Sequence, residues 1–391
     1  MSTDALEQLA QGLAARKVAG LARHRHTIAS RRGAHLTVEG REFLHFGGND
    51  YLGLAADPRV IAAAAEGAAR YGVGAGAAHL ISGHFAPHEA LERELAAWVA
   101  PCANARALLF SAGYLANLAI VTALCRRGDA VFGERLNHAC LNDAALLSRA
   151  KFTRYRQGDL DALGQRLAAS RAPRKLICTD AVFSMDGTIA PLPALLELAE
   201  RYDAWLLVDD AHGFGILGEG RGTVAHFGLT SPRIVYMGTL GKAAGVAGAF
   251  VAAHHAVIET LLQTARTYVL TTASPPLLAC ALQASLAVIR DEPQRRRHLQ
   301  ALIARFRAAA GTLPWRLQAS ATAIQPLQVG ASAQALDLSD RLWQRGLWVP
   351  AIRPPTVPRG TARLRITLSA AHADADLSRL LAVLTHLACG P

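Results

Sequence analysis

The sequence predicts an α/β fold: a large, mostly parallel sheet covered by helices, followed by a smaller C-terminal α/β domain. The chain has 391 residues, which is too long for one ordinary hydrophobic core. Apolar residues make up 51% and charged residues only 18%, the balance of a folded globular protein. Short apolar runs alternate with helical patterns through the middle of the chain, which is typical of a parallel sheet with helices on both faces.

Six short apolar runs are the strands expected in the large sheet: residues 105–110, 130–132, 175–179, 205–208, 234–237 and 249–252. Helical patterns are expected at 4–25, 160–170, 193–202, 277–310 and 373–387. Further strand patterns lie near 35–46 and at 323–327, 347–349 and 362–367. We therefore expect an N-terminal helix with short strands at 1–47, a large domain at 48–285 and a small domain at 286–391.

Charge, cysteine content and hydropathy argue against several classes of protein, among them nucleic-acid-binding, metal-binding and membrane proteins. Lys and Arg number 41 against 30 acids, a formal charge of +11 that suits an anionic substrate or simply an arginine-rich proteome. Because no basic run is interleaved with aromatic residues, we expect no nucleic-acid binding. The six cysteines form no C-x-x-C pair, and we expect no metal site. The acidic first residues and the lack of a long apolar run predict neither a signal peptide nor a membrane span, and hence a cytoplasmic protein.

The strongest functional signal is a pair of segments at the ends of two successive expected strands, where the apolar run gives way to polar and small residues. These segments are LLVDDAHG at 206–213 and GTLGK at 238–242. The carboxyl ends of parallel strands meet at one edge of a sheet, so Asp209, His212 and Lys242 are expected to lie close together. Pyridoxal phosphate needs such a set: an amine that forms a Schiff base and moves protons, and a carboxylate that keeps the ring nitrogen protonated. A Gly-Lys pair without an aspartate and a histidine after a neighbouring strand would instead indicate a lysine in a solvent-exposed loop.

A second segment predicts a phosphate site. Ser111-Ala-Gly113-Tyr114 follows an expected strand and opens a helical pattern, and the N–H groups at the start of a helix bind phosphate. Thr239 and Thr272 are candidate hydroxyl donors to the same phosphate.

Six stretches between residues 46 and 242 resemble the α-oxoamine synthases, the acyl-CoA-dependent branch of the aspartate-aminotransferase fold (fold type I of the pyridoxal-phosphate enzymes). The stretches are FGGNDYLGL at 46–54, FSAGYLAN at 110–117, NHA at 137–139, VFSMDG at 182–187, VDDAHG at 208–213 and GTLGK at 238–242. The resemblance implies a pyridoxal 5'-phosphate-dependent acyltransferase that forms a carbon–carbon bond with loss of CO2 and works as a homodimer.

The resemblance also implies roles for single residues. It makes Lys242 the Schiff-base lysine and Asp209 the partner of the ring nitrogen, and it stacks His138 on the ring. The remaining cofactor contacts that it implies are Ser184 and His212 at the ring hydroxyl, and Gly113, Tyr114 and Thr239 at the phosphate, with Thr272 supplied by the other subunit. The expected substrate-binding residues are Arg365, which would hold the amino-acid carboxylate, together with Asn49, Arg23 and Arg353. Arg353 could equally be a plain loop arginine, and Arg23 could belong to a solvated helix face.

Within the family, the segment AIRPPTVP at 351–358 resembles the member that joins L-alanine to a pimeloyl thioester in biotin biosynthesis. Pimeloyl-CoA and pimeloyl-acyl-carrier protein both remain possible donors. A sister enzyme such as 2-amino-3-ketobutyrate CoA ligase is the alternative that this segment disfavours. A non-catalytic partner subunit is disfavoured by the presence of Lys242, and a dinucleotide-binding dehydrogenase by the absence of a strand–GxGxxG–helix unit.

One segment departs from the family pattern. Where the family usually has Gly-Ser-Arg, this chain has Ala77-Ala78-His79. We expect altered contacts at this segment without loss of the chemistry.

Overall fold

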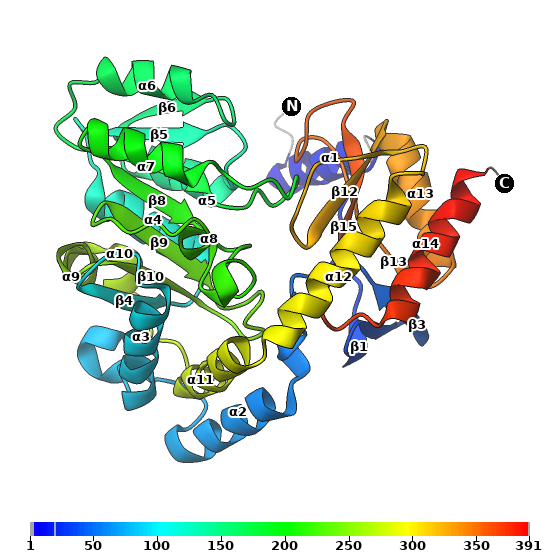
Figure 1. Cartoon of the computed structure of the whole chain (residues 1–391), viewed down its shortest axis with the longest axis horizontal. Helices are drawn as coiled ribbons and strands as arrows, with labels where there is room; N and C mark the ends of the chain where they lie inside the picture. Colours follow the sequence, from blue (N-terminus) through cyan, green and yellow to red (C-terminus); the bar gives the residue numbers. More distant parts are fainter. Residues whose placement is uncertain (1–3, 19–20, 390–391) are drawn as a thin grey trace.

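The computed structural model describes residues 4–18 and 21–389. Figure 1 shows two parts: the large sheet and its helices lie at the left, and the C-terminal sheet with its long helices lies at the right. The large sheet has seven strands in the order β4-β10-β9-β8-β7-β5-β6. Their bounds are β4 Ala105–Phe110, β5 Ala130–Glu134, β6 Lys151–Tyr155, β7 Lys175–Asp180, β8 Trp205–Asp209, β9 Ile234–Thr239 and β10 Ala249–His254. Only β10 runs antiparallel to its neighbours β4 and β9.

Both faces of the central part of this sheet are buried, which explains why most of its strands are largely apolar runs. Along β8, Leu206 and Val208 point into one core, whereas Leu207 points into the other. The first core is covered by α3 Ala86–Val99, α6 Leu160–Ala168, α7 Leu192–Arg201, α8 Thr223–His226 and α11 Pro276–Asp291. The second is covered by α4 Gly113–Leu124, α5 Ala139–Leu147, α9 His255–Thr264 and α10 Arg266–Val269. The helix α2 Pro58–Tyr71 packs against α11.

The smaller part of the molecule is built from the two ends of the chain. One four-stranded sheet joins β1 Ile28–Arg32, β2 His35–Val38 and β3 Arg41–His45 to β13 Leu347–Trp348. The other has the order β11-β12-β15-β14, with bounds β11 Arg316–Leu317, β12 Ile324–Gly330, β14 Ala351–Ile352 and β15 Ala362–Thr367. The helices are α12 Pro293–Ala310, α13 Ser332–Gln344 and α14 Asp374–Ala388. In Figure 1, α12 runs from the large part into the smaller one.

The predicted fold class is confirmed, and the differences lie in single elements. The expected helix at 277–310 is two helices, because Pro293 begins a new one directly after Glu292. The strand β6 was missed, since its sequence KFTRY is no continuous apolar run and mixes charged, polar and apolar residues at the edge of the sheet. The N-terminal helix α1 Ala5–Val18 is shorter than expected: residues 21–25 are not helical, and residues 19–20 lie outside the described residues.

Within the described ranges, no helix combines the length and the apolar character that crossing a bilayer requires.

Candidate active site

A cavity of about 210 Å³ opens at the carboxyl edge of the large sheet. Strands β7 and β8 end side by side there, with Asp180 paired in register with Asp209. The residues predicted for cofactor binding that line this cavity are Gly113, Tyr114, His138, Ser184, Asp209, His212, Thr239 and Lys242. The structure therefore brings together eight residues that span 130 positions of the sequence.

The amine of Lys242 contacts the imidazole of His212, with 3.0 Å between Nζ and Nε2. On its other side, His212 Nδ1 lies 2.6 Å from the hydroxyl of Tyr51. Burial lowers the pKa of Lys242, although the carboxylates of Asp209 and Asp180 act in the opposite direction. Burial, and then the Lys242 charge, lower the pKa of His212 well below its usual range. A neutral His212 can accept from Lys242 at Nε2 and donate to Tyr51 at Nδ1.

The two adjacent aspartates of the Asp-Asp pair have different environments. Asp209 lines the cavity, and its Oδ2 accepts a hydrogen bond from Asn117 Nδ2 at 2.7 Å. Asp210 accepts from the backbone N–H and the hydroxyl of Thr223, both at 2.6 Å, and from the hydroxyl of Tyr236 at 2.8 Å. Burial raises the pKa of Asp210 to about 7. Asp209 is therefore the carboxyl that faces the cavity, whereas Asp210 joins surrounding chain segments.

His138 also lines the cavity and is fixed at the start of α5. Its Nδ1 accepts from the backbone N–H of Cys140 at 3.3 Å, as a helix N-cap does. Its own backbone N–H donates to Asp180 Oδ2 at 3.1 Å. Burial, and then the neighbouring Asp209, raise the pKa of Asp180 well above its usual range. These contacts orient the exposed ring of His138 beside the cavity.

The start of α4 lies at the cavity and has backbone N–H groups that can bind an anion. The helix begins at Gly113, directly after β4, and its first N–H groups have no partner within the helix. Gly113 and Tyr114 line the cavity together with Thr239, whose hydroxyl donates to the carbonyl of Gly248 at 3.1 Å. A phosphate fits such a helix start because the N–H groups point towards it.

Arg365 lies on the side of the site formed by the smaller part of the molecule. It comes from β15 and is only 6% exposed. Its Nε donates to the carbonyl of Ser184 at 2.6 Å, and its Nη1 and Nη2 lie 3.5 and 3.4 Å from Asn49 Oδ1. The predicted substrate residues Arg365 and Asn49 thus lie together, next to a wall of the cofactor cavity.

A second cavity of about 670 Å³ adjoins the first, because His138 and Ser184 line both. Its wall includes four residues of the segment 355–358 and two arginines, Arg135 and Arg363. Arg363 is paired with Asp186. Of the segment at 351–358 that carries the family resemblance, Pro355 and Val357 thus line this cavity, whereas Ile352 and Pro354 are not among the lining residues.

Five predicted site residues line neither cavity: Arg365 and Asn49, described above, and Thr272, Arg23 and Arg353. Thr272 is exposed and forms an isolated β-bridge with Ala78. Arg23 is exposed in the irregular segment that precedes β1. Arg353 is partly buried directly after β14 and does not line either cavity.

The sequence reasoning missed Asp180, Asn117, Cys140 and Tyr51 as neighbours of the site. Asp180 could have been found, because it ends an expected strand as Asp209 does. Asn117 stands in the quoted FSAGYLAN motif, but its contact with Asp209 depends on the packing of α4 against the sheet. No sequence pattern places Tyr51 beside His212, since the two are far apart in the chain.

Comparison with known proteins gives the family. The profile of the class I and II aminotransferases matches residues 41–384. The 8-amino-7-oxononanoate synthase of Herminiimonas arsenicoxydans is 59% identical over 384 residues, which cover 97% of this chain and 98% of that protein. A serine palmitoyltransferase from S. paucimobilis, solved with a PLP–myriocin aldimine bound, is 27% identical with a TM-score of 0.91 over 98% of both chains.

A solved 8-amino-7-oxononanoate synthase from Francisella tularensis is 29% identical, with a TM-score of 0.76 over 88% of this chain and 97% of that one. These similarities extend over both parts of the molecule and confirm the family expected from the sequence motifs. The chain therefore belongs to the class I and II aminotransferase family and, within it, to the 8-amino-7-oxononanoate synthases.

Proposed function

We propose that this enzyme condenses L-alanine with a pimeloyl thioester, giving 8-amino-7-oxononanoate, CO2 and the free thiol, as a step of biotin biosynthesis. Relatives that are 54–59% identical over nearly the whole chain carry the name of this activity. The observation that carries the proposal is the single cavity in which Lys242, His212 and Asp209 meet. The pimeloyl donor is the CoA thioester or the carrier-protein thioester, and the +11 charge of the chain suits either.

The residues of the first cavity fit pyridoxal phosphate as the cofactor. The helix start at Gly113 suits its phosphate, the flat ring of His138 suits the face of its pyridine, and Asp209 can accept a hydrogen bond from a protonated ring nitrogen. Asp180, which also lines the cavity, has a buried Oδ1 with no partner in the described part of the chain. When bound, this cofactor supplies an electron sink that stabilises negative charge at the amino-acid Cα.

Lys242 is proposed to hold the cofactor and then to act as the general base at the alanine Cα. A general base works best when its pKa is close to the operating pH, and burial lowers the pKa of Lys242 in that direction. His212 accepts from the amine and so orients it. The hydroxyl of Tyr51 in turn orients His212.

Arg365 is proposed to bind the alanine carboxylate. Its guanidinium can make two parallel hydrogen bonds to a carboxylate, and Asn49 holds it in place at 3.4–3.5 Å. The second cavity is proposed to take the pimeloyl chain, since Pro355 and Val357 give it an apolar wall. Arg135 in the same wall offers a positive charge for the distal carboxylate, whereas Arg353, expected from the sequence to bind substrate, does not line this cavity.

A homodimer is proposed to complete the site. Exposed apolar side chains are found on α1 and around the bridge that joins Ala78 to Thr272: Leu6, Leu9, Leu13, Val73, Leu80, Ile81 and Leu270. Large exposed apolar patches of this kind mark protein interfaces. Thr272 lies among them, outside the cavity of its own chain, where it can reach the phosphate of a partner. The cytoplasmic location expected from the sequence stays a prediction.

The proposal is tested by supplying alanine with pimeloyl-CoA, pimeloyl-carrier protein, acetyl-CoA or succinyl-CoA and measuring released thiol, with mass spectrometry of the product. We expect the highest kcat/KM with one of the pimeloyl donors. Some turnover of glycine in place of alanine is expected, since one methyl group contributes only about 1–3 kcal/mol of discrimination. A higher kcat/KM for acetyl-CoA or succinyl-CoA would refute the substrate assignment and leave the cofactor assignment intact.

A further inference from the structure

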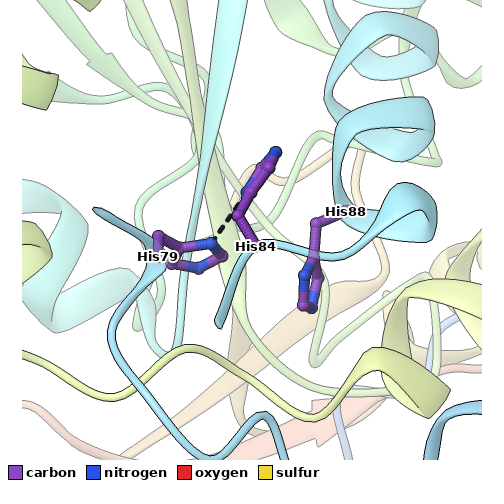
Figure 2. Close-up of side chains that lie close together, drawn as sticks. All are labelled: His79, His84 and His88. Carbon is purple, nitrogen blue, oxygen red and sulfur yellow. Dashed lines mark hydrogen bonds between the residues drawn. The ribbon is translucent and has the colours of Figure 1, made fainter. Parts of the chain in front are cut away.

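Three histidines converge outside the active-site cavities, at the entrance to α3 (Figure 2). His79 begins the single π-helical turn His79–Gly83, His84 follows this turn, and His88 lies in the first turn of α3. His79 and His84 approach each other with 2.9 Å between their Nδ1 atoms. One ring nitrogen from each of the three lies within 4.8 Å of the others. The cluster therefore has the ligand types and the spacing of a small metal site.

The outer nitrogens of two of these rings have the partners that metal-binding histidines usually have. His84 Nε2 lies 3.2 Å from a carboxylate oxygen of Glu89. His88 Nε2 lies 2.9 Å from the backbone carbonyl of Ser274. Histidine ligands typically donate their second N–H to a carboxylate or a backbone carbonyl, which fixes the tautomer and the ring orientation. In both rings this places the proton on Nε2 and the lone pair on Nδ1.

The inner nitrogens suit a tetrahedral ion. Zinc–nitrogen bonds of about 2.0–2.1 Å separate neighbouring ligand nitrogens by about 3.3 Å, so the Nδ1 pair of His79 and His84 needs to open by only a few tenths of an ångström. At present His88 Nδ1 accepts from the backbone N–H of Phe85 at 3.0 Å, and a metal ion would replace this hydrogen bond. His79 is held from its other side by the ring of Tyr268, stacked at 5.1 Å between centroids.

We propose that His79, His84 and His88 bind a divalent transition-metal ion such as Zn²⁺ through their Nδ1 atoms. The site differs from the sequence expectation of no metal, which considered cysteine spacing and not these histidines. Such an ion would link the turn before α3 to the segment that carries Thr272, because His88 contacts Ser274 and Ala78 bridges to Thr272. It would act on the structure of this segment, since none of the three histidines lines the active-site cavities.

A competing ligand set shares one residue with this site. His84, Glu89 and Glu92 also place ligand atoms within 4.8 Å of one another. Glu92 already accepts from the backbone N–H of Leu109 at 2.8 Å. Three imidazoles are the better match for zinc, copper or nickel, whereas a carboxylate-rich set suits harder ions.

The test uses the holoenzyme after treatment with a chelator, titrated with zinc chloride in a calorimeter and followed by metal analysis after dialysis. We expect the wild type to hold one more zinc ion per chain than the variants His79→Gln and His84→Ala, and to gain a higher Tm with zinc that neither variant gains. Glu92→Gln tests the competing set, and His226→Ala is the control for unrelated histidines. The visible absorbance of the bound cofactor reports whether each variant is folded.

Loss of one zinc equivalent in both histidine variants, with retention in Glu92→Gln and His226→Ala, supports the three-histidine site. Equal zinc content in the wild type and the folded histidine variants overturns it. Loss in Glu92→Gln with retention in His79→Gln overturns it as well, in favour of the carboxylate set.

Discussion

The two walls of the active site are built in different ways. The cofactor wall comes from one edge of one sheet: Asp209 ends β8, and Lys242 lies just beyond the end of β9. The substrate wall comes from both ends of the chain, with Asn49 and Tyr51 after β3 and Arg365 on β15. The first wall is fixed by the neighbouring strands of a single sheet. The second depends on how the smaller part of the molecule packs against the larger, so changes there should affect binding before they affect chemistry.

The largest effect is expected on the cofactor wall, for Lys242→Ala. Without the amine, neither the covalent hold on the cofactor nor the base at Cα remains, so we expect no measurable thiol release and loss of the visible absorbance of the lysine-bound cofactor. The matched control is Lys151→Ala, which removes an exposed lysine at the start of β6 and should leave both readouts unchanged. Normal turnover by a folded Lys242→Ala enzyme would refute the role of Lys242 and, with it, the assignment of this wall to the cofactor.

The next effect separates the two adjacent aspartates. Asp209→Ala should lower kcat by about 10²- to 10³-fold, because it removes a buried charge that faces the cofactor cavity. Asp210→Ala should act on stability, because it leaves two donors of Thr223 and one of Tyr236 without an acceptor at about 1–3 kcal/mol each. Thermal unfolding and kcat per folded enzyme are measured on both. If Asp209→Ala lowered kcat only slightly while Asp210→Ala lowered it by orders of magnitude, Asp210 and not Asp209 would be the carboxylate that acts on the cofactor.

On the substrate wall, Arg365→Ala should impair alanine binding more than chemistry. Loss of a bidentate hydrogen-bond partner of the carboxylate should weaken the binding free energy of alanine by about 2–4 kcal/mol, or about 30- to 1000-fold in affinity. The alanine dissociation constant is measured from the change in cofactor absorbance on titration. Arg316→Ala, an exposed arginine of the same small sheet, is the control. An unchanged alanine dissociation constant would show that Arg365 does not bind the alanine carboxylate.

The same contrast explains what could be predicted from sequence. Asp209 and Lys242 follow from a local pattern, a buried apolar strand that ends in a polar residue. The stacking role of His138 and the carboxylate role of Arg365 came from resemblance, because nothing in their local sequence separates them from other histidines and arginines. Asn117 and Tyr51 were missed because their contacts with Asp209 and His212 arise only when helices and distant segments pack on the sheet edge.

The smallest effect is expected for the residue that connects the two walls. Tyr51 belongs to the substrate wall by sequence, but its hydroxyl lies 2.6 Å from His212 Nδ1, and it is only 1% exposed. Tyr51→Phe keeps the ring in its packing and removes the hydroxyl, which also donates to Asn49 Oδ1 over a longer 3.4 Å. Loss of the shorter contact leaves the buried Nδ1 of His212 without this partner at a cost of about 1–2 kcal/mol.

Since His212 contacts Lys242 and not the alanine site, we expect kcat to fall by about 5- to 30-fold with little change in KM for alanine. The pH dependence of kcat should shift as well, because the substitution changes the hydrogen bonding of His212, whose pKa is already lowered by burial and by the charge of Lys242, whereas a purely structural role of Tyr51 would leave the profile in place. Tyr202→Phe, at the end of α7, is the control. A raised KM for alanine with unchanged kcat would assign Tyr51 to substrate binding alone, and the two walls would then act independently.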